Sequence, residues 1–110
     1  LIGSVGGTDS VIVALYNAAG TLVKSSALAG TVVGTTATYQ EVPFTSTYAA
    51  VGPAQYFVSV SFNGTTARFR TIPVGAILPT GQAAGAFGTL DALTPPTTFT
   101  ADLAPVGYTY

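Results

Sequence analysis

Gly or Pro interrupts almost every stretch of this chain that is long enough to hold a helix. The 110 residues include 13 glycines and 7 prolines, and no apolar stripe recurs with the period of about 3.6 residues that an amphipathic helix shows. The runs between these breaks are rich in β-branched Val, Ile and Thr, which suit extended backbone. The sequence therefore predicts an all-β chain.

Two runs predict the clearest strands. Residues 10–16 are apolar on both alternating faces, which is typical of a strand covered on both sides or of one near the middle of a sandwich. Residues 55–62 carry two serines on one face, while the other face is apolar throughout and consists of Tyr56, Val58, Val60 and Phe62. Turn residues at 17–20 predict a hairpin that returns over 21–28. A further strand is predicted over 36–44.

Turn signals flank the second of these strands. Asn63-Gly64 follows it directly, and Asn-Gly between two β-patterned runs predicts a type I′ hairpin whose partner strand covers 65–72. In that strand Arg68 and Arg70 would point outward and Phe69 inward. Before the strand, residues 52–58 (GPAQYFV) match a tyrosine corner, in which a tyrosine hydroxyl bonds back to the upstream backbone.

Short strands separated by turns predict one domain over residues 1–110, an antiparallel two-sheet sandwich of about 7 or 8 strands, Ig-like or jelly-roll-like. Within it, 1–9 is expected to be an N-terminal arm or linker and 10–73 to hold the core strands. Residues 74–96 form a Gly/Pro-rich excursion, and residues 97–110 return as closing C-terminal strands. An apolar, aromatic end of this kind suggests a strand docked on this domain or on a neighbour.

The scarcity of charge limits the partners. Charged residues make up 6% of the chain, with three basic and four acidic side chains and a net charge of -1. Three cations are too few for nucleic-acid binding, and the apolar runs fall short of the roughly 20 residues that a membrane-spanning helix needs. A surface so poor in charge solubilises an isolated domain weakly, which favours a domain that works inside an assembly.

Catalysis is not expected. The chain has no His and no Cys, so the commonest general base, a common nucleophile and the strongest transition-metal ligands are missing. The carboxylates of Asp9, Glu41, Asp91 and Asp102 are scattered, with no pairing for glycosidase chemistry and no calcium loop. We therefore expect no enzyme activity, no catalytic residue, no cofactor and no metal, and interpret Asp9, Glu41 and Asp102 as solvated or cap-forming.

Several side chains are candidates for contacts with other molecules. Arg68 and Arg70 either keep an edge strand soluble, face a carboxylate across the strand, or anchor an interface, where Arg is enriched. Aromatic rings near the C-terminus are the other interface candidates, namely Phe87, Phe99, Tyr108 and Tyr110. Tyr39 and Tyr48 are the candidates for a glycan contact, because Tyr16 and Tyr56 are expected in the core or corner. The alternative for Tyr39 and Tyr48 is that each ring packs against the protein while its hydroxyl group is exposed to water.

Longer stretches resemble a known class of domain. The segments LYNAAGTLVKSSALAG (15–30), YQEVPFTSTY (39–48), GPAQYFVSVSFNGTTARFRTIP (52–73) and FGTLDALTPPTTFTADLAPVGYTY (87–110) resemble a C-terminal β-sandwich domain of tailed-bacteriophage virion proteins. The phrases NGTTxRFRTIP and TPPTTFTAD are the most distinctive. A part of the pattern is also similar to bacterial pre-peptidase C-terminal sandwiches, which usually carry more acidic residues.

The virion resemblance implies a capsid decoration (cement) protein or a tail-fibre or other appendage module. Its partners would be other virion proteins, with the chain in a homo-oligomer or bound in the assembly, and with no nucleic acid and no membrane insertion. The alternative is a carbohydrate-binding or cell-surface adhesion module that contacts a host glycan, on a fibre or on a secreted or bacterial cell-surface protein. A third hypothesis is that the chain is a passive spacer in a multidomain surface protein.

Overall fold

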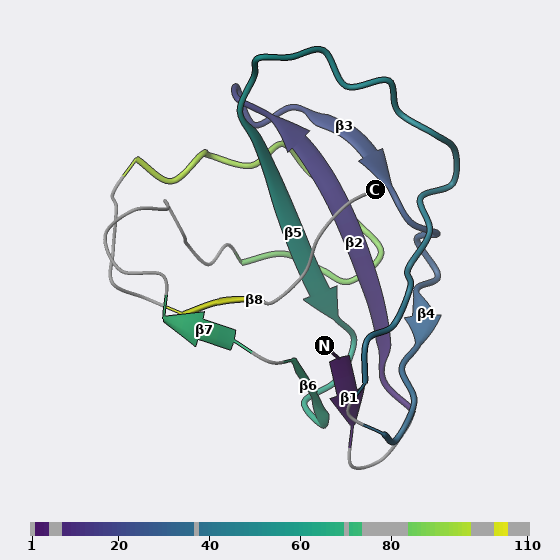
Figure 1. Ribbon diagram of the computed structural model, residues 1–110. Helices are drawn as coiled ribbons and strands as arrows, with labels where there is room; N and C mark the ends of the chain where they lie inside the picture. Colours follow the sequence, from purple (N-terminus) through teal and green to yellow (C-terminus); the bar gives the residue numbers. More distant parts are fainter. Residues whose placement is uncertain are drawn as a thin grey trace.

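The computed structural model describes residues 2–4, 8–36, 38–69, 71–73, 84–97 and 103–105. Strands, turns and irregular segments make up these residues, and none of them is helical (Figure 1). The prediction of an all-β chain is therefore confirmed for the described ranges.

A four-stranded antiparallel sheet is the main element. Its central strand is β2 (Ser10–Asn17), and β5 (Tyr56–Phe62) pairs with one edge of β2 from Val11↔Phe62 to Asn17↔Tyr56. The other edge of β2 pairs first with β4 (Thr31–Val32) and then with β3 (Leu22–Ser25). β2 thus lies in the middle, between β5 on one edge and β3 and β4 on the other (Figure 1).

The central strand is covered on both faces, as its apolar pattern predicts. Val11 and Ile12 point to opposite faces of a strand, yet their exposed fractions are 0% and 1%. On the Val11 side the buried cluster includes Val33 and Ala67. Residues 84–97 pass behind β2 and β5 in Figure 1, and the backbone N–H of Leu93 donates to Gly20 O at 2.9 Å. The core therefore lies on the two sides of one strand.

The hairpin between β2 and β3 is confirmed. Asn17 Oδ1 accepts hydrogen bonds from the N–H groups of Ala19 and Thr21, both at 3.0 Å. Gly20 closes the turn at a φ of 80°, a left-handed conformation that glycine adopts without steric cost. The returning strand is shorter than predicted, because β3 ends at Ser25.

The predicted hairpin at Asn63-Gly64 is wrong. A type I′ turn needs positive φ at both central residues, and neither Asn63 nor Gly64 has one. β5 pairs with β2, whereas the next strand, β6 (Ala67–Phe69), pairs with β1 (Ile2–Ser4). The chain leaves the four-stranded sheet at this point, where Asn63 Oδ1 accepts from the Ser10 N–H at 2.7 Å and the Asp9 carboxylate accepts from the residues that follow.

The strand predicted over 36–44 is also wrong. Residues 38–44 contain only an isolated bridge at 38, and residue 37 lies outside the described residues. Both edges of β2 are already taken by β5 on one side and by β3 and β4 on the other. The segment that follows instead runs beside β3, where the Thr45 N–H donates to Ser25 O at 2.9 Å.

Two short ribbons complete the described strands. β1 lies within residues 1–9, the expected arm or linker, and pairs with β6. β7 (Thr71–Pro73) pairs with β8 (Leu103–Pro105), which lies in the C-terminal region expected to return as strands. Residues 84–96, the described part of the Gly/Pro-rich excursion, contain no strand.

Candidate interaction surface

The tyrosine corner forms as predicted. The Tyr56 hydroxyl donates to Val51 O at 3.2 Å and accepts from Val51 N at 3.2 Å. The intervening Gly52-Pro53 peptide bond is cis. The first residue of β5 is therefore tied to backbone five residues upstream, which fixes where the strand begins.

Tyr48 belongs to the same corner. Its ring lies edge-on to the Tyr56 ring, with 5.9 Å between centroids and 74° between planes. The two hydroxyl oxygens are 3.4 Å apart. Because Tyr56 gives its single proton to Val51 O, Tyr48 is the donor between them. That hydrogen bond, with a smaller effect of desolvation, raises the pKa of Tyr48 above its ordinary value. Tyr48 thus makes an internal contact.

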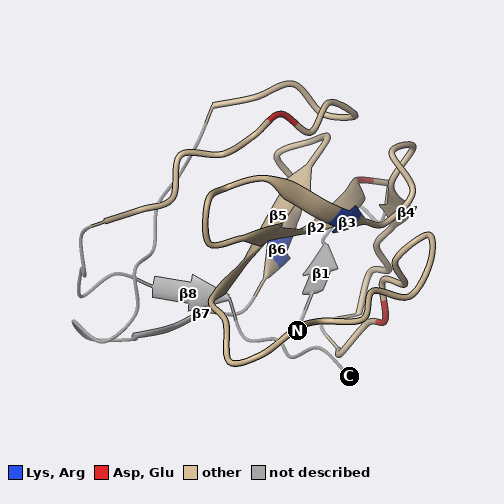
Figure 2. Cartoon of the chain, turned by 90° about the horizontal axis from the view of Figure 1, so that it is seen from above, with Lys and Arg blue, Asp and Glu red and all other residues tan. Residues whose placement is uncertain are grey.

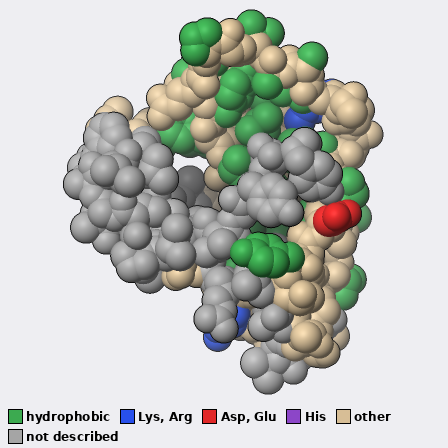
Figure 3. All heavy atoms as spheres, in the orientation of Figure 1, with side chains coloured by type: hydrophobic (Ala, Val, Ile, Leu, Met, Phe, Trp, Pro, Cys, Tyr) green, Lys and Arg blue, Asp and Glu red, His purple; other side chains and the backbone are tan. Residues whose placement is uncertain are grey.

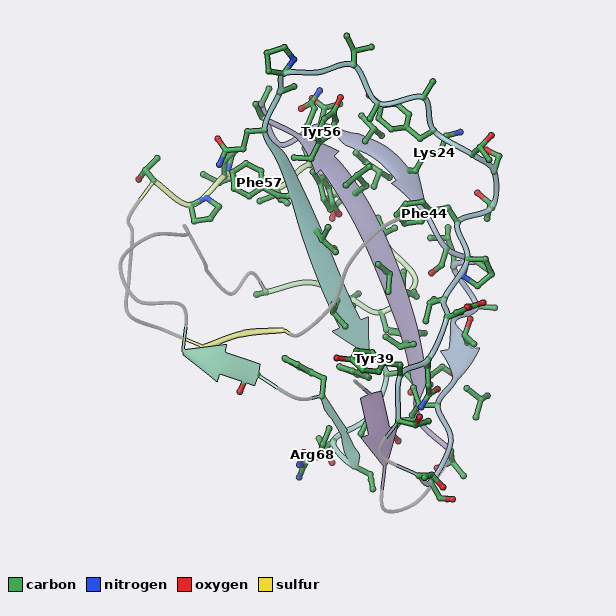
Figure 4. All side chains as sticks on the ribbon, viewed as in Figure 1. Lys24, Tyr39, Phe44, Tyr56, Phe57 and Arg68 are labelled. Atoms are coloured by element: carbon green, nitrogen blue, oxygen red, sulfur yellow. The ribbon has the colours of Figure 1, made fainter. Side chains whose placement is uncertain are left out.

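Tyr39 is placed differently. Its side chain is 61% exposed, and it lies in front of the lower ends of β2 and β5 in the view of Figure 4. No ring contact joins it to Tyr48 or to another aromatic residue that the structure describes. Of the two glycan candidates, only Tyr39 presents a free ring.

The structure describes one of the two arginines, Arg68. Arg68 is exposed, and its Nη1 donates to the backbone carbonyls of Thr65 and Ala67, the latter at 2.9 Å. The prediction that Phe69 points inward is wrong, because Phe69 is 38% exposed and stacks on Phe62 with 5.7 Å between centroids. The guanidinium therefore caps its own turn. Arg70 lies outside the described residues.

Phe87 is half-buried and packs against Gly30. A Cβ atom on Gly30 would lie 2.7 Å from Phe87 Cζ and 2.8 Å from Ser10 Cβ, so the ring rests against backbone that only glycine leaves open. This contact fixes residues 84–97 against the β3–β4 connection. The other aromatic interface candidates, Phe99, Tyr108 and Tyr110, lie outside the described residues.

Apolar side chains are the main exposed feature of the described surface. Val51 is 75% exposed and Val58 53%. Figure 3 shows hydrophobic side chains gathered over the upper ends of β2 and β5 as drawn. The exposed large apolar residues are Leu28, Val32, Tyr39, Val51, Val58 and Phe69. Of these six residues, the sequence predicted only Tyr39 as a contact candidate. For the other five, the low overall charge was the only sequence feature that indicated an apolar surface.

Charged side chains are few and scattered over this surface (Figure 2). Lys24 Nζ donates to Ser46 Oγ at 2.8 Å. Asp9 is the exception to the scatter, because it is 8% exposed and its Oδ2 accepts from the N–H groups of Thr66 at 2.8 Å and Ala67 at 2.6 Å. The cap-forming interpretation is thus confirmed for Asp9. The side chain of Glu41 is exposed to solvent, and Asp102 lies outside the described residues.

The described carboxylates do not converge. Over the described ranges, no group of three or more His, Cys, Asp or Glu side chains is arranged to hold a metal ion. The same residues include no helix of the length and hydropathy that crossing a bilayer requires. What distinguishes the described surface is its set of exposed apolar side chains.

Comparisons with known proteins identified no similar protein. A scan against protein-family models, a search of curated proteins and a search of solved structures each found no match.

Proposed function

We propose that this chain is a non-catalytic structural protein of a bacteriophage virion, a capsid decoration (cement) protein or a tail-appendage module, acting through contacts with other virion proteins. The observation that carries the proposal is the set of free apolar side chains on a surface with little charge. Val51 and Val58 are more than half exposed, and 6% of the whole chain is charged.

Such a surface suits permanent burial against neighbours. Each Å² of apolar surface removed from water contributes about 25 cal/mol, whereas burying a charged group costs hydration free energy that only pairing with an opposite charge offsets. A surface of Thr, Ser, Ala and Val avoids most of that cost. Obligate interfaces are correspondingly more apolar than the ordinary protein surface.

The finer architecture belongs to the same proposal. We infer that the four-stranded sheet is one layer of a two-sheet sandwich, Ig-like or jelly-roll-like, whose second layer is built around the β1–β6 and β7–β8 ribbons. Stacking of Phe62 in β5 on Phe69 in β6 supports this, because it joins the end of the sheet to the β1–β6 ribbon.

Association in solution tests the proposal. Light scattering and sedimentation velocity on the wild-type chain should show association that increases with concentration. Val51→Glu should weaken it, because the charge enters an exposed apolar position. Thr47→Glu is the matched control, since it adds the same charge at an exposed polar position and should leave association unchanged. A monodisperse wild-type monomer at high concentration would contradict the proposal.

A second candidate function rests on Tyr39. An exposed tyrosine ring in front of a sheet is a surface on which a sugar can stack, as a carbohydrate-binding or adhesion module requires. Tyr39→Ala should then abolish saturable binding to a bacterial polysaccharide, with Tyr39→Phe retaining most of it. Absence of binding by the wild-type chain across a broad panel of glycans would eliminate this candidate.

A further inference from the structure

β5 has one edge without a strand partner among the described residues. β2 occupies its other edge over the whole length of the strand. Val13, which lies opposite Val60, directs its own backbone groups away from β5, because its N–H donates to Ser26 Oγ and its C=O accepts from Ser26 N. Since hydrogen-bonded and non-hydrogen-bonded pairs alternate along an antiparallel ladder, four residues of β5 direct their backbone groups outward. They are Tyr56, Val58, Val60 and Phe62.

The sequence of β5 carries none of the residues that protect edge strands in natural sheets. Edge strands are usually blocked by a charged side chain, by Pro or by a bulge. β3 has Lys24 and is accompanied by Thr45, and β6 has Arg68. Pro73 ends β7 and Pro105 ends β8. In contrast, β5 reads YFVSVSF over 7 residues and contains no charge, no Pro and no Gly.

We propose that the open edge of β5 pairs with β5 of a second copy of this chain, antiparallel and about a two-fold axis that passes at Ser59. In this register Tyr56 lies opposite Phe62 of the other copy, and Val58 lies opposite Val60. All four outward-facing residues then face another outward-facing residue, which no other two-fold register achieves. The edge is complementary to itself, and this is why a second copy fits it.

The side chains fit the same register. Residues directly opposite on adjacent strands share a face, so Val58, which is 53% exposed in the single chain, would be covered by a valine. On the other face Ser59 would meet Ser59. No like charges are brought together, because the strand has none. The inference rests on the proposed function, since it names the partner and the contact for one of the interfaces of the assembly.

Cysteine cross-linking tests the register. Directly opposite residues in a non-hydrogen-bonded pair have Cα atoms about 4.5 Å apart, which is within the range of a disulfide. The chain contains no cysteine, so Ser59→Cys gives a single thiol, and mild oxidation should convert most of it to a covalent dimer. Ser61→Cys is the matched control on the same face, because its partner is Phe57, and should cross-link at least about tenfold more slowly.

A backbone variant tests the pairing independently. Val58→Pro removes an outward N–H that β2 does not use, so the internal ladder is retained. Dimerisation should weaken about 10- to 100-fold, because each copy loses a hydrogen bond to the other. Val58→Thr keeps the N–H and should dimerise within a few-fold of wild type. Circular dichroism establishes that each variant is folded.

The outcomes separate this inference from the proposed function. Selective cross-linking through Ser59→Cys with weaker association of Val58→Pro supports it. Equal cross-linking of the two cysteine variants, or wild-type association in Val58→Pro, would overturn the β5 contact while leaving association through other surfaces intact. A strand of a different protein captured at this edge, with the wild-type chain monomeric, would also overturn it.

Discussion

The two ends of β5 are held by contacts of different kinds. At its start, the Tyr56 hydroxyl bonds to the backbone of Val51, five residues upstream. At its end, the turn is held by Asp9, whose carboxylate accepts from Thr66 N and Ala67 N across more than 50 positions of sequence. The first contact is local and forms from neighbouring residues alone. The second requires the N-terminal region to be in place, so we expect it to contribute more to the stability of the whole domain.

The largest effect is expected at the Asp9 end. Asp9→Ala leaves two N–H groups without their acceptor beside a buried strand, and each charge-assisted bond is worth about 1.5–3 kcal/mol. The free energy of unfolding should fall by about 3 kcal/mol in a urea titration. Glu41→Ala removes an exposed carboxylate and should change it by less than about 0.5 kcal/mol. Equal effects of the two substitutions would remove the distinction between the ends.

The tyrosine corner should have a smaller effect. Tyr56→Phe deletes the bonds to Val51 and the contact with the Tyr48 hydroxyl, in a partly exposed position. A loss of about 1–2 kcal/mol is expected by the same titration. Tyr39→Phe removes a hydroxyl from an exposed ring and is the control, with no change beyond about 0.5 kcal/mol. A loss as large as that of Asp9→Ala would show that the local end dominates.

Gly64 gives a sharper test of the second turn. A Cβ atom there would lie 2.6 Å from Asp9 Cγ, so Gly64→Ala should be destabilising because of Asp9 and not because of backbone conformation. A double-mutant cycle with Asp9→Ala should therefore show coupling of about 1 kcal/mol, with Gly64→Ala costing less when Asp9 is absent. Full additivity would indicate a turn that needs a left-handed Gly64, as in the hairpin that the structure excludes.

The smallest effect concerns the Tyr48 hydroxyl. Its hydrogen bond with Tyr56 raises the pKa of Tyr48 in the folded protein, so the neutral phenol is favoured there. The stability that this provides is present below the ordinary tyrosine pKa and is lost as pH rises through the raised value. Absorbance titration of the phenolates should show a late-titrating tyrosine in wild type that Tyr48→Phe removes. Identical curves would contradict the contact.

The same contrast explains which features the sequence could predict. The tyrosine corner, the β2–β3 turn and the cover on both faces of β2 depend on residues within a few positions of one another or on a single apolar run. The Asn63-Gly64 turn carries the strongest local hairpin signal in the chain, but Asp9 and Ser10 bind residues 63–67 instead. A distant carboxylate cannot be located from local propensity.

The exposed residues show the same limit. The alternation in β5 correctly places Tyr56, Val58, Val60 and Phe62 on one face. Alternation does not say how far cover extends along that face, and Val60 packs against the core while Val58 is left half exposed. Which edge of β5 stays open likewise depends on the pairing of the whole sheet. The set of exposed apolar side chains can therefore be identified only from the fold.

Hydrogen exchange of single amides tests most directly the central claim that this chain works by contact with other subunits, beginning at the open edge of β5. Ser59 directs its N–H to β2 and should be protected at every protein concentration. The outward N–H groups of Val58 and Val60 should exchange fast in dilute protein and become protected as concentration rises and dimers form. Fast exchange of Val58 and Val60 at all concentrations, including those at which the protein associates, would contradict the account.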